Sequence, residues 1–394
     1  MKFQSYSPKA VFSSTNQLPP RVFIAPQRYI QGPGVLDHIG QYMSLLKVSR
    51  AAILASKRGL SAQGAQVTRS LRKENIDSVH AQFNGECSRQ EIEAQVELLR
   101  DQKPDCLVAV GGGKLVDAGK SIAYRLDVPL VIVPTLASND APCSAISVIY
   151  TPEGKSDGAE YYPQNPALVV MDTDVVAHAD ERYLVAGMGD AMATWYEAKV
   201  CFDNPDARNL LGTRPTLAAC AIAEICAKTL FEQGEAAAIS VRANRNDGAV
   251  ENVVEANTLL SGLGFESGGL AVAHALALAY TRIDVVHETY MHGEMVAMGL
   301  MAQLAMEQSD DAQRVAKFLA RVGLPLHLQQ FSLCPRHRSE LDIVIEATMV
   351  KEIAHNMPMP VTHDSLRQAI LDAHDLGLHI TREVGDEAYR RLQD

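Results

Sequence analysis

A run of three glycines and a lysine, GGGK at positions 111–114, lies between an apolar stretch and a helix-like stretch. Such glycines let the backbone approach an anion closely, and a helix that begins there adds free N–H groups and the positive end of its dipole. We expect a phosphate-binding turn, although a tight strand-to-helix turn without a ligand has the same pattern. The run fits neither GxGxxG, because Val116 replaces the third glycine, nor a nucleoside-triphosphate loop, because Leu115 follows the lysine.

Several histidines and carboxylates are candidate metal ligands, but none is decisive by itself. His274 lies in an apolar, helix-like stretch, where a histidine is more often a satisfied core residue. His292 opens a predicted helix and can simply cap it, and Asp190 opens another, where a carboxylate complements the helix dipole. HETYMH (287–292) is not a zincin motif, because its two histidines are five residues apart and point to different sides of a helix.

The elements that position these residues follow two patterns. In the N-terminal part, apolar runs typical of strands alternate with helix-like segments, which predicts a parallel α/β sheet. The strands are expected at 51–55, 78–83, 106–110 and 130–134, and the helices at 62–73, 89–101 and 114–125. Residues 21–26 could form an earlier strand, and 144–150 and 167–172 a later pair with a hairpin or loop between them.

Beyond about Asp180, strand signals nearly vanish and helical spacing takes over. Helices are expected at 186–201, 215–232, 248–262, 268–280, 293–307, 311–321, 339–355 and 364–377. The sequence thus predicts a Rossmann-like nucleotide-binding α/β domain at 1–180, with a polar extension at 1–20, followed by an all-α domain at 181–394.

Composition narrows the function further. The chain has 394 residues and a formal net charge of −11, which argues against nucleic-acid or anionic-membrane partners. No stretch approaches the roughly 20 apolar residues of a membrane span, and the N-terminus lacks the apolar core of a secretory signal. The seven cysteines never have CxxC spacing, which indicates reduced thiols in a cytoplasmic protein.

Several longer motifs, taken in order, resemble those of the glycerol dehydrogenase family. This family belongs to the zinc- or iron-dependent alcohol dehydrogenases, whose fold is similar to that of dehydroquinate synthase. Besides GGGK, the motifs are VPTLASNDAPCSAISVIY (133–150), AGMGDAMATWYEA (186–198), FESGGLAVAHA (265–275), MHGEMVAMG (291–299) and HNMP (355–358). The resemblance runs from about Arg21 to the C-terminus.

The resemblance implies a zinc site formed by Asp190, His274 and His292. A carboxylate and two neutral imidazoles are suitable zinc ligands, and three protein ligands leave a position open for substrate. Iron-type relatives use a further histidine one helical turn after the aspartate, where this chain has Thr194, so we expect Zn²⁺ rather than iron.

The resemblance also implies the residues that bind substrate and dinucleotide. Asp140 would hydrogen-bond a substrate hydroxyl, and His274 would border the substrate, although an Asn-Asp turn at 139–140 can be purely structural. The dinucleotide would contact Ser56, Gly112, Gly113, Lys114, Thr135, Ser138, Ser144, Ile146 and Tyr150.

Three positions depart from the family pattern. Leu115 replaces the usual threonine after GGGK, and Ala277 replaces a second histidine three residues after His274. The family ends its first βα strand with an aspartate that binds the adenosine ribose, whereas this chain has Ser56, followed by Lys57 and Arg58. Because no carboxylate repels a 2′-phosphate there, we expect NADP(H) to be accepted at least as readily as NAD(H), against the family pattern, unless the two basic residues are merely solvated.

We therefore expect a zinc-dependent NAD(P)-linked dehydrogenase that oxidises glycerol, or a related vicinal diol, to dihydroxyacetone by hydride transfer. Its partner would be a small polyol, and the protein a homo-oligomer. The alternatives are a 2-oxo acid or hydroxycarboxylate reductase of the same fold, a dehydroquinate-synthase-like lyase, and a non-catalytic metal or nucleotide binder.

Overall fold

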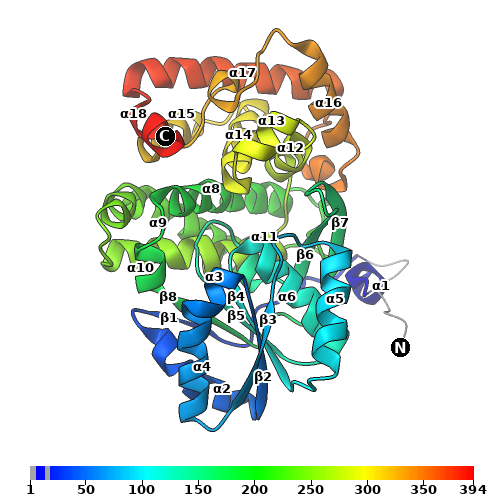
Figure 1. The fold of residues 1–394 in the computed structure, drawn as a ribbon. Coiled ribbons are helices and arrows are strands. Elements are labelled where there is room, and N and C mark those ends of the chain that lie inside the picture. The colour runs from blue at the N-terminus through cyan, green and yellow to red at the C-terminus, as the bar shows by residue number, and fades with distance from the viewer. Residues whose placement is uncertain (1–5, 14–17) are drawn as a thin grey trace.

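The computed structural model describes residues 6–13 and 18–394, and its centre is one six-stranded parallel sheet. The strand order is β1-β8-β5-β4-β2-β3. The strands are β1 (Tyr29–Gly32), β2 (Arg50–Ala55), β3 (Asp77–Gln82), β4 (Cys106–Gly111), β5 (Leu130–Pro134) and β8 (Leu168–Asp172). The predicted parallel α/β sheet is confirmed, and in Figure 1 it lies below the helical half of the chain.

Helices cover both faces of this sheet, which is why its central strands are continuous apolar runs. Along β4, Leu107 and Ala109 pack into one core and Val108 and Val110 into the other. The first core is closed by α5 (Arg89–Arg100) and α6 (Gly113–Leu126). The second is closed by α2 (Ile39–Met43), α4 (Gln63–Lys73) and the 3₁₀ turn Val35–His38.

Two strand predictions are corrected by the structure. Residues 21–26 form no strand, apart from a single bridge at Arg21, because their backbone bonds instead to the helical part, for example Ile24 N–H to Ser267 Oγ. Residues 146–150 and 168–172 do not pair with each other. β6 (Ile146–Tyr150) forms an antiparallel hairpin with β7 (Ser156–Tyr161), while β8 joins the main sheet.

The rest of the chain is helical, as predicted, although several bounds differ. The longer helices are α8 (Glu181–Asp203), α9 (Leu217–Arg242), α12 (Val272–Tyr280), α14 (His292–Met306), α15 (Ala312–Val322), α16 (Arg338–Met349) and α17 (His363–Val384). After Asp180, two described helices were not predicted, α13 (Asp284–Thr289) and α18 (Glu387–Gln393). Short elements are α1 (Pro8–Phe12), α3 (Lys57–Ser61), α7 (Thr173–Ala177) and 3₁₀ turns at Ser44–Leu46, Ala141–Cys143, Leu328–Phe331 and Glu352–Asn356.

The helix predicted at 248–262 continues to Gly268 through an irregular segment. It comprises α10 (Gly248–Glu255), a π-helical turn (Ala256–Leu260) and α11 (Ser261–Gly268). Gly269, with φ +115°, ends it, and α12 starts after a bend of 107°. Within the described ranges no single helix is long and apolar enough to cross a membrane, although this bent pair passes the same criteria when taken together.

The π-helical turn joins the carboxyl edge of the sheet to α8. Asn257 Nδ2 donates to Ala137 O, in the loop after β5, and to Leu184 O on α8. A Cβ on Gly187 would lie 2.0 Å from the same Ala137 oxygen, so glycine is required where α8 meets this loop. The loop after β5 thus packs against α8, the helix that carries Asp190.

Candidate active site

The structure brings Asp190 of α8, His274 of α12 and His292 of α14 together. Their ligand atoms all lie within 4.8 Å of one another. Asp190 Oδ1 is 3.2 Å from His274 Nε2 and 3.6 Å from His292 Nε2. Ligand atoms of a tetrahedral metal ion with bonds of about 2.1 Å lie about 3.4 Å apart, so these two separations would allow one metal ion to be bound by the three residues. Asp190 is fully buried, whereas 41% of the His292 side chain is exposed, which leaves the cluster open on that side.

Two glycines let α8 and α14 approach each other at this cluster. Gly189 precedes Asp190 in the chain, and Gly293 follows His292. A Cβ on Gly293 would lie 1.8 Å from Ala186 O, and a Cβ on Gly189 would lie 2.4 Å from Gly293 O. Neither position can hold a larger residue without separating the helices, so glycine is what brings these two candidate ligands close.

Glu197, which the sequence analysis missed, fixes the orientation of His274. This buried carboxylate accepts a hydrogen bond from His274 Nδ1, and its other oxygen accepts from the backbone N–H of Ala271 at 2.7 Å and of His274 at 3.0 Å. Because Nδ1 is engaged by Glu197, Nε2 is the ring nitrogen that faces Asp190. The spacing held a signal, because Glu197 follows Asp190 by seven residues and so lies on the same helix face.

The electrostatics of the cluster follow from these contacts. Burial alone would raise the pKa of Asp190, but the charges of His292 and His274 outweigh it and lower that pKa. The pKa of His274 is raised well above its usual value because the Glu197 and Asp190 carboxylates outweigh the opposing effect of burial. Asp190 is thus held ionised, as a metal ligand must be.

Asp140 lies beside the cluster, at the start of the 3₁₀ turn Ala141–Cys143. Its backbone N–H donates to Asp190 Oδ2 at 3.3 Å, and its Oδ2 accepts from Ser261 Oγ at 2.7 Å. Ser261 Oγ in turn lies 2.8 Å from Thr194 Oγ1. Burial, and then the Asp190 charge, raise the pKa of Asp140 well above its usual range. Oδ1 of Asp140 makes no hydrogen bond to any residue in the described ranges and can accept one from a ligand.

Thr194, the residue one helical turn after Asp190, contacts Ser261. Its hydroxyl is buried and engaged with Ser261, so this position supports Asp140 through Ser261. Ala277, the other departure on this side, is fully buried in the helical core.

The glycine turn lies where β4 ends and α6 begins. A Cβ on Gly113 would lie 2.6 Å from Asn139 Nδ2, and one on Gly111 would lie 2.9 Å from Leu115 Cδ1. Leu115, the departure from the family's threonine, is therefore a buried packing residue. Lys114 Nζ donates to Glu86 Oε2 at 2.7 Å and lies 5.8 Å from the ring centroid of Tyr150.

The other predicted dinucleotide residues lie near the same sheet edge. All but one of them are partly exposed. Thr135 and Ser138 follow β5, Ile146 and Tyr150 belong to β6, and all four are partly exposed. Ser144 is fully buried, and its hydroxyl donates to Ala141 O and accepts from Lys120 Nζ, each at 3.0 Å. Its side chain therefore braces the loop from inside.

Ser56 directly follows β2, the neighbour of β4 in the sheet. β2 and β4 are in register up to Ala55 and Val110, so Ser56 and Gly111 end adjacent strands. Ser56 Oγ accepts from Gly59 N–H at 3.0 Å and caps α3. Lys57 and Arg58 are exposed, and neither side chain hydrogen-bonds to any part of the chain that is described. Two uncompensated cations thus stand beside the glycine turn.

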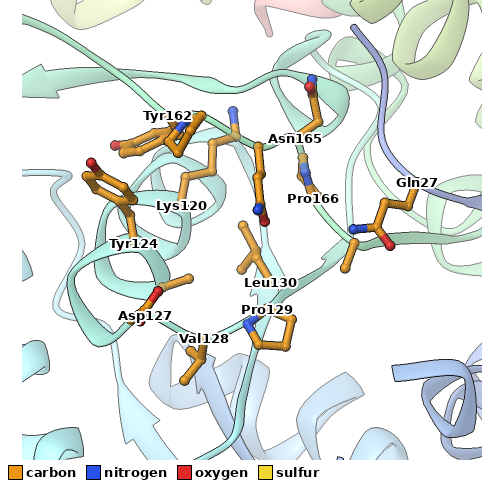
Figure 2. Close-up of a pocket in the computed structure, with 14 residues that line it drawn as sticks. Gln27, Lys120, Tyr124, Asp127, Val128, Pro129, Leu130, Tyr162, Asn165 and Pro166 are labelled. Carbon is orange, nitrogen blue, oxygen red and sulfur yellow. The ribbon is translucent and has the colours of Figure 1, made fainter. Parts of the chain in front are cut away.

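A cavity of about 320 Å³ lies elsewhere, between α6 and the segment that follows β7. Figure 2 shows Lys120, Tyr124, Tyr162 and Asn165 around it, and the two tyrosine rings meet edge to face at 5.4 Å. None of the predicted site residues lines this cavity. Lys120 is held by Asp117, Ser144 and two backbone carbonyls, so its charge is satisfied within the protein.

Comparison with known proteins agrees with this architecture. A family model described as iron-containing alcohol dehydrogenase matches residues 26–173. A glycerol dehydrogenase from Citrobacter freundii is 41% identical over 91% of this chain and 98% of its own length. A glycolaldehyde reductase from Halobacterium salinarum is 37% identical over 91% of this chain and 98% of its own.

The solved structures give the same result. The crystal structure of glycerol dehydrogenase from Schizosaccharomyces pombe has a TM-score of 0.87 and 34% identity, covering 98% of this chain and 95% of that one. High identity over nearly the whole length, together with the matching fold, decides the family. This chain is an alcohol oxidoreductase of the iron-containing alcohol dehydrogenase family, and it belongs with the glycerol dehydrogenases of that family.

Proposed function

We propose that this enzyme oxidises glycerol, or a related vicinal diol, at its secondary alcohol. In the balanced reaction, glycerol and NAD⁺ (or NADP⁺) give dihydroxyacetone, the reduced dinucleotide and one proton. The observation that carries the proposal is the convergence of Asp190, His274 and His292 within 4.8 Å, close to Asp140.

The donor set fits a zinc ion. One carboxylate and two imidazoles are ligands that zinc accepts, their separations suit tetrahedral bonds, and the exposed side of His292 leaves access for a substrate. Asp190, His274 and His292 would hold the ion. When bound, zinc would act as a Lewis acid that lowers the pKa of the reacting hydroxyl.

The chain's own residues supply orientation and selectivity. Glu197 keeps a proton on His274 Nδ1, so the ring presents the lone pair of Nε2 to the site. Ser261 fixes one oxygen of Asp140 and leaves Oδ1 to accept a hydrogen bond from a second substrate hydroxyl. A diol would satisfy this carboxylate, whereas a mono-alcohol would leave it unpaired.

The dinucleotide would lie along the sheet edge formed by the ends of β2, β4 and β5. Its pyrophosphate would meet Gly112, Gly113 and Lys114, and its adenosine ribose would lie at Ser56. Thr135, Ser138, Ser144, Ile146 and Tyr150 would follow the path to the nicotinamide. Lys57 and Arg58 offer charge-assisted donors for a 2′-phosphate, so we propose that NADP is accepted as well as NAD.

The alternatives require a cation that these contacts do not provide. A 2-oxo acid or a dehydroquinate-like sugar phosphate carries negative charge that a site must pair. Within the described part of the chain, no lysine or arginine hydrogen-bonds to Asp140, Asp190, His274 or His292. Lys199 and Arg282 are exposed. A neutral polyol therefore suits the site better.

A substrate panel tests the proposal. We expect glycerol to give a higher kcat/KM than 1-propanol, pyruvate or glycolaldehyde, with activity lost after chelation and restored by Zn²⁺. Glycolaldehyde is included because a relative at 37% identity bears the name glycolaldehyde reductase. Preference for glycolaldehyde or pyruvate over glycerol would replace the diol proposal, and full activity in metal-free protein would contradict the zinc site.

We further propose that residues 1–180 and 181–394 form separate domains, and that the enzyme works as a cytoplasmic homo-oligomer. The seven cysteines support a reducing compartment, because none forms a disulfide. Light scattering coupled to size-exclusion chromatography measures the oligomeric state, and a purely monomeric protein at micromolar concentration would contradict it.

A further inference from the structure

A buried ion pair joins the start of α8 to the first turn of α14. Arg182 Nε donates to Glu294 Oε1 at 2.8 Å, and Arg182 Nη2 donates to Glu294 Oε2 at 2.9 Å. Only 2% of the Glu294 side chain and 19% of the Arg182 side chain are exposed. Such a two-point contact fixes both side chains in one geometry, because a guanidinium and a carboxylate are planar and complementary.

Both residues of this pair also hydrogen-bond to the backbone on the N-terminal side of His292. Glu294 Oε2 also accepts from Met291 N–H at 2.7 Å, and Arg182 Nη2 also donates to Thr289 O at 2.9 Å. The contacts therefore tie down the chain between Thr289 and Glu294, in which His292 is the first residue of α14.

His292 depends on such backbone anchoring more than the other two candidate ligands do. His274 is oriented by Glu197, and Asp190 lies fully buried in the middle of a long helix. His292 is partly exposed, and its ring hydrogen-bonds to no residue within 6–13 and 18–394. Within the described residues, no side chain orients the His292 ring by a hydrogen bond, as Glu197 does for His274. The position of the His292 ring therefore follows from the backbone of the first turn of α14.

We infer that Arg182 and Glu294 are positioning residues that hold His292 at the metal. This inference rests on the proposed metal site. Loss of the pair would leave a buried charge unpaired and release the turn, so His292 would spend less time at ligand distance. Groups that orient a ligand typically change metal affinity by about 10–100-fold when they are removed.

The C-terminal helix adds a third contact and provides a control. Gln393 Nε2 donates to Glu294 Oε1 at 3.3 Å, so α18 packs against the same carboxylate. Arg391, on the same helix, pairs with Glu181 at 3.1 Å and forms no hydrogen bond or ion pair with Glu294 or with the turn before His292. Arg391→Gln therefore removes an arginine–glutamate pair at the same end of α8 without touching the proposed anchor.

The test measures Zn²⁺ affinity by competition with a chromophoric chelator. It compares the wild type with Arg182→Gln, Glu294→Gln, Arg182→Lys and Arg391→Gln, and the thermal midpoint of each metal-free protein reports folding. We expect a loss of about 10–100-fold for the first two variants, a smaller loss for Arg182→Lys, and less than a twofold change for Arg391→Gln. The visible spectrum of the Co²⁺-loaded protein should change in the same order.

The outcomes are distinguishable. Arg182→Gln and Glu294→Gln proteins that bind Zn²⁺ as tightly as the wild type would overturn the inference. Equal losses in all four variants, with parallel drops in thermal midpoint, would also overturn it and indicate general destabilisation. Arg182→Lys keeps the charge but loses the two-point contact. If Arg182→Gln and Glu294→Gln fail to fold, an Arg182→Lys protein that binds Zn²⁺ as tightly as the wild type would overturn the inference. A wild type that binds no divalent metal would overturn the proposed metal site itself.

Discussion

The Glu197 carboxylate accepts a hydrogen bond from Nδ1 of His274 and leaves Nε2 of the same ring facing Asp190 at 3.2 Å. One carboxylate on α8 thus orients a candidate ligand on α12 toward another carboxylate on α8. Glu197 also accepts two backbone N–H groups at the start of α12, so it fixes both the ring and the helix that carries it.

Removing this carboxylate should weaken metal binding. Glu197→Gln keeps an acceptor but loses the charge that favours a proton on Nδ1, so we expect Zn²⁺ affinity to fall by about 10–100-fold. Chelator competition measures it, with Glu224→Gln on the exposed side of α9 as the matched control. Unchanged affinity in Glu197→Gln would show that the contact serves packing alone.

Removing a ligand should abolish turnover in a way that added metal does not reverse. A zinc ion bound at the proposed site would supply several kcal/mol of charge stabilisation, so chelation of the wild type should lower kcat by about 100-fold or more, and Zn²⁺ should restore it. In His274→Ala the loss should persist at saturating Zn²⁺. Metal content by mass spectrometry accompanies the assay, and an active, metal-free His274→Ala protein would contradict this assignment.

Asp140 should determine the preference for polyols. Asp140→Asn keeps the side-chain shape but can place an amide N–H where the carboxyl group offers Oδ1 as an acceptor, and a buried hydrogen-bonding group left without a partner costs about 1–3 kcal/mol. We expect kcat/KM for glycerol to fall by about 10–100-fold, with little change for 1-propanol and in the Kd for dinucleotide. Equal losses for glycerol and 1-propanol would assign Asp140 a structural role.

Lys57 and Arg58 should set the choice of dinucleotide. Arg58→Ala should lower kcat/KM with NADP by about 10-fold or more, since charge-assisted hydrogen bonds contribute about 1.5–3 kcal/mol, and should leave NAD nearly unaffected. Ser56→Asp should shift the preference toward NAD, because the new carboxylate repels a 2′-phosphate. Lys73→Ala, at the far end of α4, is the control. If the wild type strongly prefers NAD and Arg58→Ala leaves kcat/KM with NADP unchanged, Lys57 and Arg58 are solvated surface residues that do not select the dinucleotide.

Glu266 should make folding stability depend on pH. Burial is the main cause that raises the pKa of Glu266 to about 7, while its bonds from Ala145 N–H and Asn165 Nδ2 oppose the shift. The folded state therefore binds more protons than the unfolded state between about pH 4.5 and 7, so this residue's contribution to stability is full below that window and is lost as pH rises through it. The loss is at most about 3 kcal/mol.

The measurement compares urea unfolding of the wild type and Glu266→Gln at pH 5 and pH 8. We expect the variant's unfolding free energy to fall less over this interval than that of the wild type, while the exposed control Glu224→Gln follows the wild type. Identical pH dependence in wild type and Glu266→Gln would contradict the raised pKa.

The local pattern of the sequence determined most of the sheet. The runs 51–55, 106–110 and 130–134 became β2, β4 and β5 because their side chains are apolar on both faces, a demand of parallel strands covered by helices on both sides. Residues 21–26 were wrongly expected to be a strand, since a short apolar run is equally suited to a segment that crosses to the helices and bonds to Ser267. Propensity reports a preference and does not say which partner supplies the hydrogen bonds.

The sequence also determined the residue types of the candidate site, since the motifs contain Asp190, His274, His292, Asp140 and the glycine turn. The tertiary structure decided which of these residues lie close together and which side chains orient them. Helices far apart in the chain meet because Gly189 and Gly293 remove the side chains that would separate them. The same packing brought Glu197 under His274, Ser261 against Asp140, and Arg182 against Glu294. Such contacts depend on distances between helices, which single-sequence periodicity does not encode because it specifies the face of each helix and not the neighbour that covers it.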